Sequence, residues 1–166
     1  MIYLATDHRG FELKEKIKTW LIEWGFEFED MGAFKYDDND DYPDFVHKAA
    51  EAVANDPERS RGIILGGSGQ GEAMVANRYK GVRAAVFYGP PFKLLFSIGS
   101  FFASWNWRGH YTKIIKLSRE HNNANTLSIG ALFVEEKSIK NIIKLWLDTP
   151  FSNEERHKRR IEKIDI

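Results

Sequence analysis

Residues 62–72, GIILGGSGQGE, contain the pattern that indicates the fold class. Residues 62–65 form a compact apolar run, which is typical of a strand buried inside a parallel sheet. The glycine-rich residues 66–71 predict a tight turn, and residues 72–79 continue as a helix. A buried strand that opens through glycine into a helix is one βα unit of an α/β fold.

The rest of the chain alternates strands and helices in the same way. We expect further strands at residues 2–6, 26–31, 82–88 and 126–129, and further helices at residues 11–24, 43–55, 111–121, 135–147 and 153–164. This alternation predicts a three-layer α/β/α sandwich with a five-stranded parallel, Rossmann-like sheet. No repeat or domain boundary is evident, so residues 1–166 are expected to form a single domain.

Composition excludes several classes of function. Lys plus Arg and Asp plus Glu each number 24, so the formal net charge is zero and no global field favours nucleic acid or membrane. Cysteine is absent, which excludes disulfides, thiolate zinc sites and a cysteine nucleophile. The first residues become charged too early for a signal peptide, and no long apolar run indicates a membrane span. We therefore expect a cytoplasmic protein without nucleic-acid or membrane partners.

Two segments fit the alternation less well. Residues 90–110 are dense in aromatic side chains and long for a connection in an α/β fold, so they form either a packed helix or a lid. Residues 154–160 begin with two glutamates and become basic, which suits a C-terminal helix with carboxylates at its start.

The glycine-rich turn is the first candidate for chemistry. Its N–H groups, next to the positive end of a helix, can hold an anion or an enediolate, although a tight turn without a ligand is the alternative. It is not a P-loop, since no Lys-Ser/Thr follows, nor a dinucleotide fingerprint, since no ribose-binding acid is evident. Glu72 follows directly. It either stabilises the helix dipole or removes a proton α to a carbonyl whose oxyanion the turn holds.

Polar residues also flank other strands. Asp7 and His8 follow the first strand, where α/β enzymes place site residues, although Asp7 can instead cap the next helix. His121 and Asn122 precede the fifth strand, and a helix C-terminus is the alternative interpretation. We expect these strand ends to converge with the glycine turn on one site.

The C-terminal helix offers a second basic group. Arg156 and Arg160 are four residues apart, so they share one helix face and can grip a phosphate, with His157 adjacent. A solvated basic surface is the alternative.

Together these segments resemble the type B ribose-5-phosphate isomerases and their relatives that act on galactose 6-phosphate and allose 6-phosphate. The resemblance spans nearly the whole chain and rests on separated motifs in one order, namely residues 5–10 (ATDHRG), 13–14 (LK), 41–43 (DYP), 66–72 (GGSGQGE), 76–78 (ANR), 118–125 (SREHNNAN) and 156–161 (RHKRRI). It implies an aldose–ketose isomerase of a phosphorylated sugar, with ribose 5-phosphate as the first expectation.

The resemblance also implies catalytic roles. One branch of the family has Cys at the position of Gly66, and another has Gly there with a Glu after the turn, so this chain resembles the Glu branch. By position, Glu72 is then the base that moves a proton between C1 and C2 of the open-chain sugar. His121 is implied as the ring-opening acid, and Asp7 assists it.

The remaining implied roles concern binding. The turn is implied to bind the enediolate through Gly67, Ser68, Gly69, Gln70 and Gly71, with the Ser68 hydroxyl as a catalytic donor. Asn122 is implied to hold a sugar hydroxyl, and His8, Arg156 and Arg160 to hold the phosphate. No metal or cofactor is implied. The family shares its site across a homodimer, with the His121–Asn122 segment of each protomer implied to reach into the partner's pocket, so a dimer or a larger assembly such as a tetramer is expected.

Two departures from the family pattern leave the substrate open. Most members carry an Arg shortly after the fifth strand, where this chain has Leu132, so one expected cation is missing. The segment 90–110 is also longer than usual, and Arg108 within it is one hypothetical replacement for that cation. Isomerisation of another sugar phosphate therefore remains one alternative. A protein that binds sugar phosphates without catalysis is the other.

Overall fold

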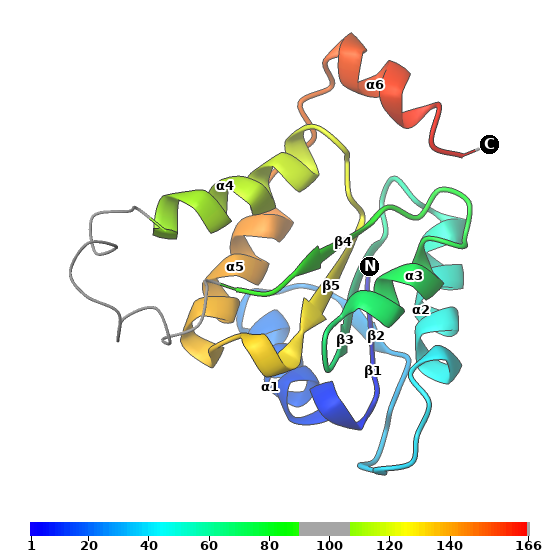
Figure 1. Ribbon diagram of the computed structural model, residues 1–166, viewed down its shortest axis with the longest axis vertical. Helices are drawn as coiled ribbons and strands as arrows, with labels where there is room; N and C mark the ends of the chain where they lie inside the picture. Colours follow the sequence, from blue (N-terminus) through cyan, green and yellow to red (C-terminus); the bar gives the residue numbers. More distant parts are fainter. Residues whose placement is uncertain (90–106, 166) are drawn as a thin grey trace.

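Five parallel strands form one sheet in the order β2-β1-β3-β5-β4 within residues 1–89 and 107–165, the part of the chain that the computed structural model describes (Figure 1). The strands are β1 (Ile2–Thr6), β2 (Phe28–Asp30), β3 (Arg61–Gly66), β4 (Ala84–Phe87) and β5 (Thr126–Gly130). Every pairing is parallel, with β1 and β3 in register over five residue pairs from Ile2↔Arg61 to Thr6↔Leu65.

Helices cover both faces of this sheet (Figure 1). They are α1 (Phe11–Glu23), α2 (Pro43–Asn55), α3 (Gln70–Ala76), α4 (Trp107–Glu120), α5 (Glu136–Asp148) and α6 (Glu155–Ile161), with short 3-10 helices η1 (His8–Gly10) and η4 (Ala131–Phe133). Side chains of α1, α4 and α5 form one core cluster with the sheet, and side chains of α2 and α3 form the other. The expected three-layer α/β/α fold is thus confirmed.

The central strands supply both clusters because successive side chains of a strand point to opposite faces. In β3, Ile63 and Leu65 belong to the cluster under α1 and α5, whereas Ile64 belongs to the cluster under α2. These side chains are at most 1% exposed, which explains why residues 62–65 are a continuous apolar run.

Several boundaries differ from the expected ones. The β2 strand starts at Phe28 rather than 26, because the Phe26 N–H donates to the Leu21 carbonyl and completes the C-terminal cap of α1. The α4 helix starts at residue 107, so the end of the aromatic-rich segment is helical, whereas residues 90–106 lie outside the described residues. The C-terminal helix spans only Glu155–Ile161.

The order of the strands creates a crevice at the carboxyl ends of β1 and β3. The chain leaves β1 toward α1 on one face of the sheet and leaves β3 toward α3 on the other. Loops that diverge in this way open a ligand crevice at the topological switch point. The residues after both strands are therefore the candidates for a site. Among the described residues, no helix is long and apolar enough to cross a membrane.

Candidate active site

Glu72 lies in the first turn of α3 with its carboxylate buried, since the residue is only 4% exposed. A methyl group built on Gly66 would lie 1.7 Å from a carboxylate oxygen of Glu72. The carboxylate therefore packs directly on the backbone at the end of β3, in the space that any side chain at position 66 would occupy. Gly66 and Glu72 depend on each other sterically.

Burial makes Glu72 a stronger base than an ordinary glutamate. Loss of solvation is the main cause that raises the pKa of its carboxyl group, and the negative charge of Asp7 raises it further. A hydrogen bond from its own backbone N–H opposes these effects without cancelling them. A carboxylate with a raised pKa, located in a crevice, is suited to accept a proton near neutral pH.

Asp7 follows β1 and is also buried. Its Oδ1 accepts a hydrogen bond of 2.9 Å from the Arg9 N–H, so Asp7 does cap η1, as the structural alternative predicted. Burial raises the pKa of Asp7; the Arg9 N–H and the charge of His8 oppose this, while the charge of Asp40 adds to it. Asp7 therefore serves the local backbone and contributes a carboxyl group to the crevice.

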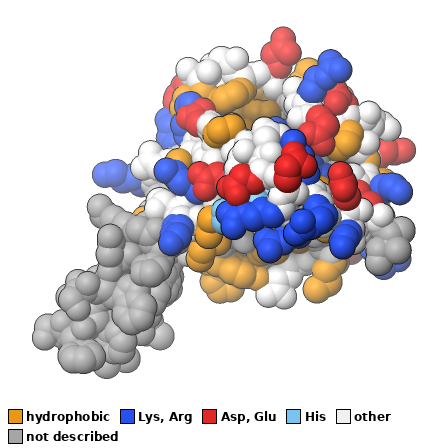
Figure 2. Space-filling model, turned by 90° about the horizontal axis from the view of Figure 1, so that it is seen from above, with side chains coloured by type: hydrophobic (Ala, Val, Ile, Leu, Met, Phe, Trp, Pro, Cys, Tyr) orange, Lys and Arg blue, Asp and Glu red, His pale blue; other side chains and the backbone are white. Residues whose placement is uncertain are grey.

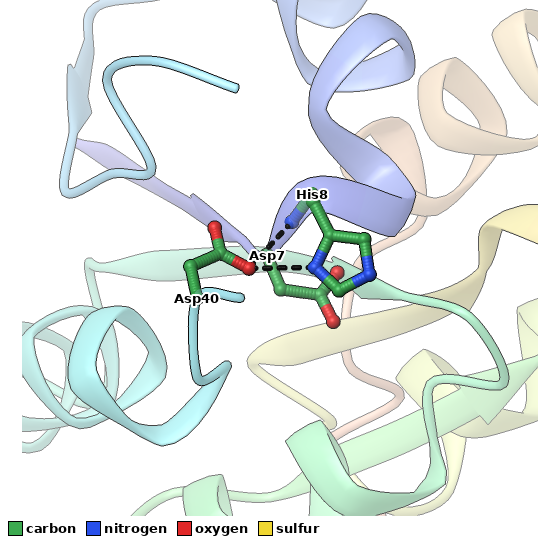
Figure 3. A group of neighbouring side chains, drawn as sticks. All are labelled: Asp7, His8 and Asp40. Carbon is green, nitrogen blue, oxygen red and sulfur yellow. Dashed lines mark hydrogen bonds and ion pairs between the residues drawn. The ribbon is translucent and has the colours of Figure 1, made fainter. Parts of the chain in front are cut away.

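His8 is held by a residue that the sequence did not single out. Asp40, from the loop before α2, accepts from the backbone N–H of His8 at 3.0 Å and from its ring Nδ1 at 2.7 Å (Figure 3). This pair places the proton on Nδ1 and leaves Nε2 directed away from Asp40 (Figure 3). The run of acidic residues at 37–41 was the available signal, but it did not indicate which carboxylate contacts His8.

Asp7, His8 and Asp40 also offer ligand atoms within 4.8 Å of one another, which is compact enough for a metal ion. Nδ1 of His8 is already hydrogen-bonded to Asp40, and a protonated Nδ1 has no lone pair for a metal. The contact with Asp40 therefore orients the imidazole through Nδ1.

The glycine turn is packed from two sides. Gly69 has φ +73°, and a methyl group there would lie 3.0 Å from the Gly130 nitrogen at the end of β5. The Ser128 hydroxyl donates to the Gly69 carbonyl at 2.5 Å. On the other side, a methyl group on Gly71 would lie 2.7 Å from the ring of Tyr42. Gly69 accordingly requires glycine, and a side chain at position 71 would displace the Tyr42 ring, whose contact with the turn the 41–43 motif did not reveal.

Ser68 and Gln70 are the exposed side chains of this turn. The Gln70 N–H donates to the Ser68 hydroxyl at 3.3 Å, and the Gln70 side-chain amide donates to the Tyr88 hydroxyl at 2.6 Å. Tyr88 lies just beyond β4. The turn is therefore tied to the ends of both β4 and β5, and its two polar side chains remain accessible to a ligand.

His121 and Asn122 lie at the opposite edge of the sheet. In the β3–β5 register, Gly62 pairs with Thr126 at one end and Gly66 with Gly130 at the other. Because residues 121 and 122 precede β5, they are at the Gly62 end, whereas the glycine turn follows Gly66. Within one chain this pair therefore does not converge with the glycine turn, and the implied sharing of the site across a homodimer stays a prediction.

The C-terminal helix joins His121 at that opposite edge (Figure 1). Nδ1 of the buried His157 donates to the His121 carbonyl at 2.9 Å, and the two rings pack edge to face at 4.2 Å. Arg156, whose Nε is 2.7 Å from a Glu154 carboxylate oxygen, and Arg160 are exposed on α6. Figure 2, which views this end of the molecule, shows a band of Lys and Arg side chains bordered by carboxylates.

The predicted site residues therefore form two groups on opposite edges. The first group comprises Asp7, His8, Glu72 and the glycine turn, and the second comprises His121, Asn122, Arg156 and Arg160. Position 132 belongs with the first group, because Leu132 donates its N–H to the Gly67 carbonyl at 3.3 Å. The Arg108 side chain lies outside the described part of the chain.

Comparison with known proteins gives a consistent result. The sequence profile of the Ribose/Galactose Isomerase family matches residues 2–91 and 109–164, which leaves most of the aromatic-rich segment unmatched. Ribose-5-phosphate isomerase B of Mycolicibacterium paratuberculosis is 38% identical over 161 residues, covering 97% of this chain and 87% of that protein. Its counterpart in Mycobacterium tuberculosis is 37% identical, covering 97% and 85%.

Two solved structures are similar throughout. The crystal structure of ribose-5-phosphate isomerase B from Mycoplasma genitalium with bound ribulose-5-phosphate superposes with a TM-score of 0.82 at 34% identity, covering 98% of this chain and 92% of that one. The Thermotoga maritima enzyme superposes with a TM-score of 0.79 at 36% identity, covering 99% and 96%.

Proposed function

The chain belongs to the Ribose/Galactose Isomerase family, and from this premise we propose that it interconverts ribose 5-phosphate and ribulose 5-phosphate with Glu72 as the base. The observation that carries the proposal is the buried Glu72 carboxylate, packed on Gly66 at the switch point of the sheet. A base at this position is next to the glycine turn, where an oxyanion can be held.

The proposed reaction moves two protons and no other atoms. Glu72 takes the proton from C2 of the open-chain aldose, and the electron pair of that bond makes the C1–C2 double bond while O1 becomes the enediolate oxygen. The turn from Gly67 to Gly71 stabilises this oxygen. Return of the proton to C1, with loss of the O2 proton and protonation of O1, gives the ketose.

Ring opening and phosphate binding complete the proposal. The substrate enters as a closed sugar, so an acid must first protonate the ring oxygen, a role we give to His121 with help from Asp7. Asn122 holds a sugar hydroxyl, and His8, Arg156 and Arg160 bind the phosphate. Asp40 orients the ring through Nδ1, and in its imidazolium form His8 donates to the phosphate from Nε2.

These roles require two copies of the chain. Glu72 and His121 lie at opposite edges of the sheet within one chain, so one carbon skeleton cannot contact both. We therefore propose a homodimer in which the His121 edge of each protomer completes the Glu72 edge of the other. A twofold axis creates two such sites at once. A tetramer of two such dimers and the cytoplasmic location remain predictions from the sequence.

Proton NMR of the purified protein with ribose 5-phosphate in D₂O tests the reaction. We expect ribulose 5-phosphate to form, with deuterium entering C1 of the ketose and C2 of the recovered aldose. Glu72→Gln keeps the shape of the side chain and removes the base, so kcat should fall about 10²-fold or more. Asp44→Asn is the matched control, because Asp44 is also an acidic residue in a first helical turn but is exposed.

Other outcomes of the same assay separate the alternatives. Turnover of a six-carbon sugar phosphate in preference to ribose 5-phosphate would indicate the same isomerisation of a different substrate. Thermal stabilisation by sugar phosphates without any deuterium incorporation would indicate a binding protein. Near-normal turnover in Glu72→Gln would remove Glu72 from the role of base.

A further inference from the structure

Three segments of the chain meet at Gly67, at the mouth of the crevice. A methyl group built on Gly67 would lie 3.5 Å from Cδ1 of Leu132 in η4, and 3.6 and 3.9 Å from Cγ and Cβ of Arg9 in η1. Leu132 and Arg9 thus both lie next to the same point of the glycine turn. Leu132 is 62% exposed, and an aliphatic side chain there offers nothing to an anion.

Arg9 brings a positive charge to this point. Its backbone N–H is fixed by the Asp7 carboxylate, so the start of its side chain is well defined. The residue is exposed, and its guanidinium has no hydrogen-bond or ion-pair partner within residues 1–89 and 107–165. This differs from Arg156, which pairs with Glu154.

The charge of Arg9 also extends toward His8. The pKa of the Tyr36 hydroxyl is raised, chiefly by a hydrogen bond with Asp38, and the positive charge of Arg9 opposes this rise. Tyr36 packs edge to face on the His8 ring, with centroids 6.3 Å apart. The Arg9 guanidinium is therefore within electrostatic reach of the His8 side of the crevice.

We infer that Arg9 binds the phosphate group of the substrate and is the cation next to Gly67, where Leu132 offers none. This inference rests on the proposed function, in which His8 contacts the same phosphate. A guanidinium can donate two parallel hydrogen bonds to phosphate oxygens, which an imidazole cannot. Arg9 would thus set the preference for phosphorylated over unphosphorylated sugars.

The Arg9→Gln variant tests this role. We expect KM for ribose 5-phosphate and the inhibition constant of inorganic phosphate to rise together by about 10- to 100-fold, the usual size of a charge-assisted hydrogen bond. The kcat should change little, because phosphate is remote from C1 and C2. Lys80→Gln is the matched control, since Lys80 is exposed in the turn after α3 and its loss changes the net charge equally.

A second variant guards against an indirect effect of the substitution. The double variant combines Arg9→Leu with Leu132→Arg, so that the cation and the aliphatic side chain exchange positions next to Gly67. We expect this double variant to recover most of the affinity that Arg9→Leu loses. Recovery would show that a cation at this point, rather than the structure of η1, determines phosphate affinity.

Calorimetric titration with inorganic phosphate keeps the test independent of catalysis. Weaker phosphate binding by Arg9→Gln than by the wild type supports the inference even if ribose 5-phosphate is not turned over, which would overturn only the proposed function. Equal binding by the two proteins, or no phosphate binding by the wild type, overturns the role of Arg9 whether or not the wild type is an isomerase.

Discussion

The space above Gly66 determines which base this crevice can hold. The Glu72 carboxylate fills it, and any Cβ at position 66 would overlap that carboxylate. A side chain at position 66 and the Glu72 carboxylate in its present place are therefore sterically exclusive.

Gly66→Ala should consequently impair both stability and turnover. The added methyl group must displace the buried carboxylate, at a cost of about 1–3 kcal/mol in the free energy of unfolding, measured by urea denaturation. Gly67→Ala is the stability control, because its methyl group would meet no atom closer than 3.5 Å.

A double-mutant cycle identifies the cause of that loss. In a Glu72→Ala background the space above residue 66 is empty, so Gly66→Ala should cost much less than it does in the wild type. If Gly66→Ala lowers the free energy of unfolding equally in the wild type and in Glu72→Ala, then backbone strain, and not the carboxylate, disfavours a side chain at position 66.

The buried carboxyl group of Glu72 also affects stability as a function of pH. Its pKa is raised in the folded protein, so the folded state binds more protons than the unfolded state between the unfolded and folded pKa values. Stability therefore falls as pH rises through that window. We expect Glu72→Gln to have a higher Tm than the wild type at neutral pH, with the difference shrinking toward about pH 4.

Thermal scans of both proteins across this range provide the measurement, and Asp44→Asn should follow the wild type throughout. A Tm difference between Glu72→Gln and the wild type that does not vary with pH would mean that packing, rather than ionisation, separates them.

At the scale of elements, a buried ion pair fixes α1 against the end of β2. Lys14 is fully buried, and its ammonium donates to Asp30, which also accepts from Lys18 at 3.0 Å. Burial alone would raise the pKa of Asp30, but hydrogen bonds from Lys14, the Gly32 N–H and Lys18 outweigh it and lower the pKa. The charged pair therefore contributes stability at neutral pH that is lost in acid, as pH falls through the lowered pKa.

Lys14→Met should destabilise the fold strongly. It keeps the aliphatic stem but leaves the partly buried Asp30 with Lys18 and the Gly32 N–H as its described partners. The free energy of unfolding, measured by urea denaturation, should therefore fall by about 3 kcal/mol. Lys16→Met is the comparison, because Lys16 forms an exposed pair with Glu136 at 2.7 Å and should cost less than about 1 kcal/mol. If Lys14→Met lowers the free energy of unfolding as little as Lys16→Met does, the pair of Lys14 and Asp30 is not important for stability.

At the scale of the whole molecule, the two groups of site residues are separated by the length of the sheet. Glu72 lies at the carboxyl edge, and His121, with α6 packed on it through His157, lies at the amino edge. A dimer that joins unlike edges has a direct consequence. Each site then takes its base from one protomer and its ring-opening acid from the other.

Mixing two inactive variants should therefore restore activity. Glu72→Gln and His121→Gln each lose their sites as homodimers, but a mixed dimer contains one site with both native residues. After subunits exchange at equal concentrations, half of the dimers are mixed and half of their sites are intact, so about a quarter of wild-type activity is expected. A mixture that stays inactive despite proven subunit exchange would place the whole site within one chain.

The layers of the fold, the glycine turn and the place of Glu72 could be predicted from the amino-acid pattern alone. Apolar runs and glycines report local backbone preference and burial, so residues 62–72 alone were enough to predict β3, its turn and α3 with Glu72 at its start. The family could also be recognised, because its motifs are short and keep their order along the chain.

Which side chains meet depends on the tertiary structure. Asp40 contacts His8 across 32 positions, Gly66 has no room for a side chain because of Glu72, and Leu132 and Arg9 both lie next to Gly67. The direction of β5 separates His121 from Glu72. Such relations depend on strand order and on the path of loops, to which distant residues contribute together, whereas the pattern of a single segment records only its own periodicity and burial.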